Sequence, residues 1–198
     1  MATIAVLDQN TIDKIAAGEV VERPASVVKE LVENAMDAGA TAITVEIRDG
    51  GISLVRITDN GSGIPAEQVP LAFLRHATSK IRSVEELVQI ASLGFRGEAL
   101  AAIAAVSRID LFTKERGVVL GTHLMLEAGE IRAEEDAGCP EGTTILVRDL
   151  FFNTPARMKF LKRDATEAGY IASAVSHAAL SRPDVSFRLI RDLSLIHI

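Results

Sequence analysis

The hydrophobic pattern changes its period abruptly near Gly39, and this change constrains the fold more than any other feature of the sequence. Over residues 23–38, apolar side chains recur every three or four positions, the spacing of one helix face. Pro24 suits the first turn of such a helix, and Gly39 stands where a C-cap is expected. Over residues 41–48, apolar and polar residues alternate instead, which predicts a half-buried strand.

The remaining sequence continues this mixture of helix and strand patterns. The turn residues 49–51 precede a second strand over 52–58, so these two strands are expected to form an antiparallel hairpin that leads to Asp59. Further strands are expected over residues 108–113, 118–126, 143–147 and 185–190. The acidic stretch 134–136 is expected to be a solvated loop.

Three more helices are expected, over residues 83–91, 97–106 and 164–181. The first and the last begin with Ser83 and Asp164, each followed three residues later by glutamate, as in a capping box. We therefore predict an α+β fold: a two-layer α/β sandwich with a mixed, mostly antiparallel sheet and helices on one face.

Composition limits the function classes. The chain has 198 residues and a net charge of −6, so it is long enough for a single well-packed domain and too acidic to coat nucleic acid over its whole surface. Any contact with DNA is expected to be local, weak and salt-dependent. Cys139 is the only cysteine, which excludes an internal disulfide. No apolar run reaches the ~20 residues of a membrane span, so a cytosolic protein is expected.

The first predicted helix carries a narrow polar sector. With Glu30 as reference and a turn of about 100° per residue, Asn34 lies at about 40° and Asp37 at about −20°. A solvated helix face is the simpler interpretation of these three residues. However, asparagine is a poor helix former, and a free surface usually mixes lysine with glutamate, so a ligand-binding role is the alternative.

Three further segments could bind a ligand. Residues 59–65 (DNGSGIP) follow a strand, and their glycines let the backbone approach a ligand beside the Asp59 carboxylate, although an ordinary turn is equally consistent. Residues 76–80 offer two hydroxyls and a cation. Residues 94–100 form a glycine-flanked loop that leads into a helix. This loop could bind an anion at the start of the helix, or its glycines could allow the helix to pack closely on the sheet. The sequence contains no Walker A loop and no GxGxxG motif.

Other candidates are weaker. The four histidines lack ligand spacing, so metal binding through histidine is not expected. Phe151, Phe152 and Phe160 are expected in the core at a strand-to-helix corner. The local basic cluster is either a solvated helix face or a contact to phosphates, and its members are Arg157, Lys159, Lys162 and Arg163.

Together, the polar sector at 30–37 and the segments 59–65, 76–80 and 94–100 resemble the GHKL (Bergerat) ATPases, which include DNA gyrase B, the ninety-kilodalton heat-shock chaperones, histidine kinases and MutL. Five segments are more specific: IAAGEVVERP at 15–24, ELVENAMDAG at 30–39, RHATSK at 75–80, SLGFRGEAL at 92–100 and DLFFNTPAR at 149–157. Within this superfamily they are similar to the MutL family of mismatch-repair proteins in particular. The resemblance covers residues 4–192.

The resemblance implies a function for most of these residues. Glu30 would be the general base and Asn34 the Mg²⁺ ligand, with Asp37 beside them. Asp59 would accept a hydrogen bond from the adenine amino group of ATP, supported by Gly61, Gly63 and Thr143. The remaining residues would surround the triphosphate as a lid: Thr78, Ser79, Lys80, Gly94, Phe95, Arg96, Gly97, Glu98, Ala99 and Leu100.

The resemblance also implies an organisation and partners. Residues 1–20 would form an N-terminal arm and residues 21–192 the ATP-binding domain, ending before a second subdomain. Residues 193–198 back-translate to a transposon end, so we expect the natural sequence to stop near Asp192. The protein would be an ATP-dependent switch of mismatch repair that forms a homodimer on binding ATP. It would be located in the cytoplasm, in association with the nucleoid. It would work with a MutS-type protein, a downstream endonuclease and helicase, and DNA.

Two alternatives stay open at this point. The first is a topoisomerase- or chaperone-type ATPase of the same superfamily, which the GFRGEAL and FFNTPAR segments disfavour. The second is a scaffold that binds DNA or protein partners through residues 157–163 and does not hydrolyse ATP. Hydrolysis of ATP in a single turnover distinguishes an ATPase from the scaffold.

Overall fold

One eight-stranded sheet organises the part of the chain that the computed structural model describes, namely residues 17, 18, 20–75, 77, 98–192 and 194–197. The strand order is β5-β4-β3-β6-β2-β1-β7-β8. All neighbouring strands are antiparallel except β1 and β7, so the predicted mixed, mostly antiparallel sheet is confirmed. The strands are β1 (Ala42–Arg48), β2 (Leu54–Asp59), β3 (Arg108–Lys114), β4 (Gly121–Glu127), β5 (Glu130–Ala137), β6 (Gly142–Arg148), β7 (Ser186–Arg191) and β8 (Ser194–His197).

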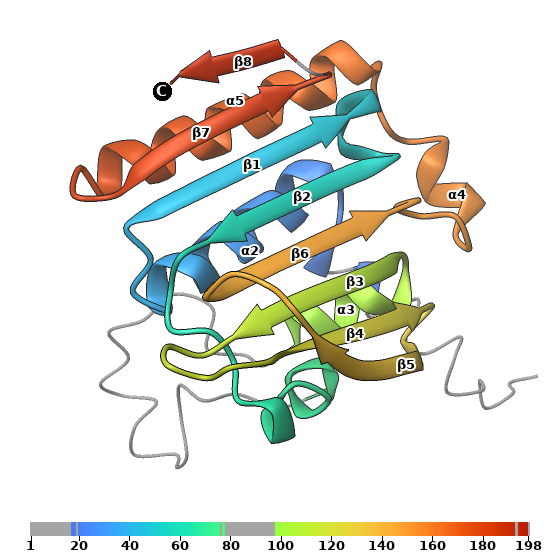
Figure 1. Ribbon diagram of the computed structural model, residues 1–198. Helices are drawn as coiled ribbons and strands as arrows, with labels where there is room; N and C mark the ends of the chain where they lie inside the picture. The colour runs from blue at the N-terminus through green and yellow to red at the C-terminus, as the bar shows by residue number, and fades with distance from the viewer. Residues whose placement is uncertain (1–16, 19, 76, 78–97, 193, 198) are drawn as a thin grey trace, which may run out of the picture.

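Helices cover one face of this sheet, as Figure 1 shows for α2 (Pro24–Asp37), α3 (Ala99–Ala105) and α5 (Asp164–Ser181). The predicted two-layer α+β architecture is therefore confirmed. The short helix α4 (Pro155–Met158) lies beyond the end of β6 (Figure 1). Single 3₁₀ turns complete the connections, at η1 (Asp49–Gly51), η2 (Ala66–Gln68) and η3 (Leu71–Phe73).

The core forms between the helices and the sheet because both carry apolar stripes of the right period. Val27, Val28 and Leu31 of α2 are buried, at the spacing that the sequence predicted. On the sheet, every second residue of β1 faces the helices, and Ile43 and Ile47 are fully buried. The amphipathic pattern therefore decides which face of α2 remains available for polar residues.

The opposite face of the sheet carries ion pairs in place of a second helix layer. Glu46 of β1 stands directly across from Arg56 of β2, pairs with it, and is only 5% exposed. The Arg48 guanidinium lies 3.3 Å from the same carboxylate. These paired charges keep the open face polar.

Two secondary-structure predictions were wrong. Residues 134–136 are not a loop but belong to β5, an edge strand whose residues are mostly exposed and therefore lack the apolar alternation that reveals a strand. The strand expected over 118–126 begins only at Gly121, and Val118 to Leu120 are exposed in the preceding loop. The helix expected over 83–91 lies outside the described residues.

The expected capping box at the start of α5 was also wrong. Arg163 is the N-cap residue, and no side chain caps this helix. Asp164 is the first helical residue. The Glu167 side chain is fully buried and accepts a hydrogen bond from the Lys162 N–H at 2.9 Å. In a capping box this glutamate would accept the N–H of the N-cap residue. Here it accepts the N–H of Lys162, in the turn before the helix.

The three phenylalanines of the corner after β6 have different environments. Phe151 is fully buried, as predicted. Phe152 is 37% exposed, and the Arg108 guanidinium lies over its ring at 4.2 Å in a cation–π contact. Phe160 is 82% exposed, because α4 ends at Met158 and provides no longer face that would carry it into the core. The prediction that all three lie in the core was therefore wrong for two of them.

The packing of β7 against the helices gives a stability prediction. Leu189→Ala removes a side chain that is 1% exposed, so the free energy of unfolding should fall by ~2–5 kcal/mol. Leu180→Ala makes the same chemical change at a site in α5 that is 80% exposed, and should change it by less than ~0.5 kcal/mol. Urea unfolding of both variants checks the prediction, which equal effects would contradict.

Candidate functional site

Asp59 is the last residue of β2. Its register partners are Ile43 on β1 and Thr143 on β6. Because side chains alternate along a strand, Asp59 lies on the same face as Ile57, the face that the helices cover. The carboxylate is half-buried, and its Oδ1 accepts a hydrogen bond from the Gly61 N–H at 2.8 Å.

Burial sets the electrostatics of this carboxylate. Removal from water raises the pKa of Asp59 above its usual value, and hydrogen bonds from the backbone of Gly61 and Thr143 oppose this shift only in part. A partly desolvated carboxylate is a strong acceptor for a ligand N–H group. The strand end is therefore suited to bind an amino group.

Two threonines extend the polar floor next to Asp59. The hydroxyls of Thr113 on β3 and Thr143 on β6 lie 3.0 Å apart, and the residues are register partners. Thr113 Oγ1 also accepts the Ile64 N–H at 2.9 Å and donates to the Gly142 carbonyl at 3.2 Å. Thr113 thus connects the loop after β2 to the start of β6. No local pattern in the sequence indicates this, because only the β3–β6 register brings the residues together.

Close backbone contacts shape the loop after Asp59. Gly63 has a φ of +75°, and a side chain there would collide with the Lys114 carbonyl. At Gly61 an added Cβ would lie 2.9 Å from the Ala38 carbonyl oxygen. The close approach that the structure shows at these two glycines is to neighbouring chain segments, and the expected approach to a ligand stays a prediction.

The Asn60 side chain of this loop also forms hydrogen bonds with the start of β1. Asn60 Oδ1 accepts the Thr41 and Ala42 N–H groups at 2.8 and 2.9 Å. Its Nδ2 donates to the Thr41 hydroxyl at 2.9 Å. The sequence pattern does not distinguish Asn60 from the rest of residues 59–65, although asparagine is common where a side chain forms hydrogen bonds with the backbone of a turn.

The loop connects directly to the polar sector of α2. The Ser62 N–H donates to the Ala38 carbonyl at 2.9 Å, just past the end of the helix. Asn34 lies four residues earlier and Glu30 eight, which is ~6 and ~12 Å along the helix axis. Both are half-buried. The Asp59 loop packs at the C-terminal end of α2. Counted from that end, Asn34 comes first and Glu30 lies farther along the helix.

The other predicted site residues divide into two groups. Asp37 is exposed and its charge acts on Arg182 just past α5, so it lies at the outer edge of the sector. Glu98, Ala99 and Leu100 form the start of α3, where the Ala102 N–H donates to the Glu98 carbonyl at 2.8 Å. The rest lie outside the described residues: Thr78, Ser79, Lys80, Gly94, Phe95, Arg96 and Gly97.

A separate groove of about 270 Å³ lies between α2 and α5. Val32 and Met36 of α2 and Ala174 and Ala178 of α5 line it. Lys29 and Glu33 also line the groove, and the α2 residues of its lining lie ~60–160° from Glu30 around the helix and ~100–160° from Asn34. The groove is therefore not part of the arrangement around Asp59, Asn34 and Glu30.

Within the described ranges, no group of three histidine, cysteine, aspartate or glutamate side chains could hold a metal ion. Nor does any helix in the described part of the chain have the length and apolar character that crossing a membrane requires.

The raised pKa of Asp59 predicts how stability depends on pH. A carboxyl group whose pKa is higher in the folded state favours folding below its unfolded pKa of 3.8, and this contribution is lost as the pH rises through the folded pKa. Asp59→Asn has no such titration. The free energy of unfolding of this variant, relative to the unaltered chain, should therefore increase between pH 4 and pH 7 in urea unfolding. Asp136→Asn, at an exposed position of β5, should show no such increase.

Comparison with known proteins places these features in a family. Residues 22–146 match the family described as histidine kinase-, DNA gyrase B-, and HSP90-like ATPase. The DNA mismatch repair protein MutL of Agathobacter rectalis is 60% identical over 192 residues, and that of Caldanaerobacter subterraneus is 56% identical. The matches cover 97% of this chain but 30% and 32% of the two relatives, so the chain spans about a third of their length.

Solved structures agree with the sequence matches. The Aquifex aeolicus MutL ATPase domain complexed with ADP has a TM-score of 0.72 at 38% identity, over 89% of this chain and 62% of that one. The N-terminal domain of a DNA repair protein has a TM-score of 0.78 at 27% identity, over 93% of this chain and 55% of that one. The chain therefore belongs to the histidine kinase-, DNA gyrase B- and HSP90-like ATPase family, and its resemblance to the N-terminal ATPase module of the MutL proteins is confirmed.

Proposed function

We propose that this chain binds ATP and hydrolyses it to ADP and phosphate, as the nucleotide-dependent switch of a DNA mismatch-repair protein. The observation that carries the proposal is that the loop after Asp59 is hydrogen-bonded to the C-terminal end of α2, the helix that carries Asn34 and Glu30, in a chain similar to a MutL domain that was solved with ADP. A purine nucleotide is long enough to place its base at one end of this arrangement and its phosphates at the other.

The base would lie at the end of the sheet. Asp59 would accept a hydrogen bond from the adenine amino group, because its carboxylate is partly desolvated and held by the Gly61 N–H. Thr143, fixed by Thr113, would support the same base. Guanine carries a carbonyl where adenine carries the amino group, so two acceptors would face each other and GTP would be rejected.

The phosphates would lie along α2, nearer Asn34 and Glu30. The Asn34 side chain offers an amide oxygen, a ligand type that Mg²⁺ accepts beside water and phosphate oxygens, so this donor fits the ion. Bound Mg²⁺ supplies neutralisation of the phosphate charge. The Glu30 carboxylate would orient the attacking water and accept its proton. Glu98, Ala99 and Leu100, with the predicted lid residues before them, would close over the phosphates.

Closure of the lid would couple nucleotide binding to dimerisation. We propose that ATP acts on the lid and on the N-terminal arm of residues 1–20, of which Ala17 is already buried, and thereby drives dimerisation of two copies. The partners would be a MutS-type protein, a downstream endonuclease and helicase, and DNA, which an acidic chain would bind weakly and without sequence preference. A cytoplasmic, nucleoid-associated location would follow from these partners. The proposed boundaries, with the domain ending at residue 192 and a non-natural tail at 193–198, remain predictions.

The adenine assignment predicts a loss of affinity on substitution. Asp59→Asn replaces one acceptor with a donor that faces the adenine amino group, and should weaken ADP binding by ~1–3 kcal/mol. Isothermal titration calorimetry with ADP and GDP measures this effect, and Asp136→Asn on exposed β5 is the matched control. Equal affinity of the unaltered chain for ADP and GDP would remove Asp59 from the proposed role.

The two α2 residues should separate binding from hydrolysis. This is best measured in a chimera in which residues 1–192 replace the matching third of the Agathobacter rectalis protein. Glu30→Ala should retain ATP binding and ATP-dependent dimerisation but lose hydrolysis by ~10²-fold or more. Asn34→Ala should lose binding of Mg-ATP, and with it the dimer. Phosphate release and size-exclusion chromatography with a non-hydrolysable ATP analogue give the two readouts. Hydrolysis at the unaltered rate by Glu30→Ala would show that the mechanism is wrong.

A further inference from the structure

Arg157 of α4 contacts a distant part of the chain, unlike the basic residues with which the sequence groups it. Its Nη1 donates to the Val21 carbonyl at 3.0 Å, across 136 positions of sequence. The guanidinium also fills the space that a side chain at position 18 would need, because an added Cβ on Gly18 would collide with it. A solvated helix face therefore does not describe this arginine, and a contact to phosphates stays a prediction for the cluster.

The segment that Arg157 contacts leads directly into α2. Ala17 and Val21 are 1% and 0% exposed, and the Val21 N–H donates to the Ala17 carbonyl at 2.7 Å. Two residues later, Arg23 is the N-cap of α2, and its guanidinium lies 4.7 Å from the Tyr170 ring of α5. No side chain caps α2. The entry to the helix that carries Glu30 therefore depends on buried apolar residues and on two arginine contacts.

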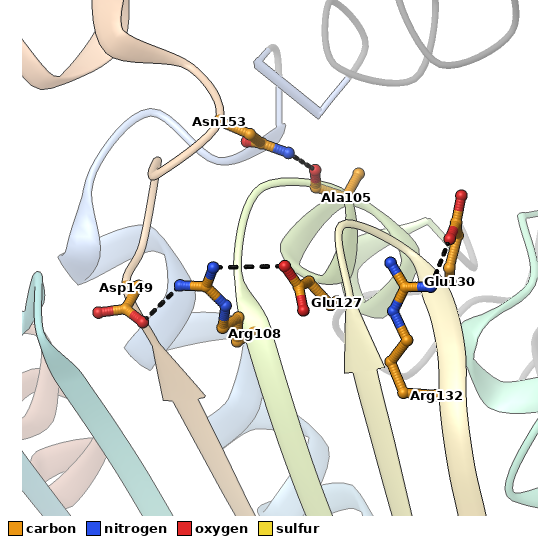
Figure 2. Close-up of polar contacts among 7 residues, drawn as sticks. All are labelled: Ala105, Arg108, Glu127, Glu130, Arg132, Asp149 and Asn153. Atoms are coloured by element: carbon orange, nitrogen blue, oxygen red, sulfur yellow. Dashed lines mark hydrogen bonds and ion pairs between the residues drawn. The ribbon is translucent and has the colours of Figure 1, made fainter.

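The segment before α4, which leads to Arg157, is hydrogen-bonded to the end of α3. Asn153, just before α4, donates from Nδ2 to the Ala105 carbonyl at 2.8 Å, as Figure 2 shows. The Phe151 N–H donates to the Val106 carbonyl at 2.7 Å. In the same turn, Asp149 pairs with Arg108 at 2.8 Å, and Arg108 reaches Glu127 at 3.3 Å (Figure 2). The segment that leads into α4 and Arg157 is thus hydrogen-bonded to the C-terminal end of α3. The same helix begins at Glu98–Leu100, which belong to the predicted lid.

We propose that Arg157 is a positioning residue for ATP hydrolysis. It ties the segment before α2 to the turn that holds the end of α3, and so keeps Glu30 in a fixed position relative to the phosphate-binding end of α3. This inference rests on the proposed function. The adenine pocket lies at the other end of α2, a helix of 14 residues and ~21 Å, so base recognition does not require Arg157.

The experiment breaks the contact from both sides. Arg157→Ala removes the guanidinium, Gly18→Ala displaces it, and Arg157→Lys retains one donor for the Val21 carbonyl. Arg132→Ala is the matched control, because it removes an exposed arginine of β5 that pairs only with exposed Glu130 among the described residues (Figure 2). Each variant is measured in the Agathobacter rectalis chimera for ADP affinity and kcat, and in this chain for hydrogen exchange over residues 20–28.

We expect Arg157→Ala to keep ADP affinity within about twofold while kcat falls by about tenfold or more, since small displacements of reacting groups are costly. Hydrogen exchange over residues 20–28 should become faster. Arg157→Lys should recover part of kcat. Gly18→Ala should resemble Arg157→Ala, and the double variant should be no worse than the single ones, because both break one contact. Arg132→Ala should match the unaltered protein.

The outcomes distinguish this inference from the proposed function. Should the unaltered chimera neither bind ADP nor hydrolyse ATP, the proposed function is wrong, and the inference about hydrolysis falls with it. Normal kcat in Arg157→Ala, with the unaltered protein active, overturns the inference alone. A parallel loss of ADP affinity and kcat means a general structural role and also overturns it. If Arg157→Ala does not fold, Arg157→Lys and Gly18→Ala decide by the same criteria.

Discussion

The register of three central strands determines where the polar site lies. Asp59 on β2 faces Thr143 on β6, which in turn faces Thr113 on β3. Because side chains alternate with a period of two, a slip of one residue would turn all three to the open face of the sheet. Burial of their apolar neighbours on the same strands, such as Ile57 and Val147, opposes such a slip. Hydrophobic burial therefore positions polar residues that contribute little to the core themselves.

The same site carries a cost that the surrounding structure offsets. Burial disfavours the charged form of Asp59, as the raised pKa indicates, so an ionised Asp59 destabilises the fold at neutral pH. Hydrogen bonds between Asn60 and the start of β1 and the packing of Gly61 against Ala38 hold the loop in place. A carboxylate that is poorly solvated and cannot move away is also one that gains most from a ligand N–H group.

Sequence periodicity was sufficient for elements with one buried face. It predicted α2 and β1 to within about a residue, and the Glu30 and Asn34 sector followed from the helix period alone. It failed for β5, whose edge position leaves no buried face to read, and for the start of α5, where Glu167 is buried by the preceding turn. Thr113 and Arg157 could not be predicted from the sequence because their partners are distant along the chain, and only strand register or tertiary packing brings them together.

The two ends of α2 are held by different kinds of interaction, and this has a functional consequence. At its C-terminal end, backbone hydrogen bonds and glycine contacts join Ala38 to the loop after Asp59, an arrangement that leaves little freedom. At its N-terminal end, the helix has no side-chain cap, and long arginine side chains hold the segment before it. Ordering a long arginine side chain costs up to ~2 kcal/mol of rotamer entropy, which offsets part of the stabilisation that each of these contacts provides. In the proposed function, the base and the attacking water are thus positioned at opposite ends of α2 by different contacts, so a change at one end can alter the affinity for the base or the rate of hydrolysis without altering the other.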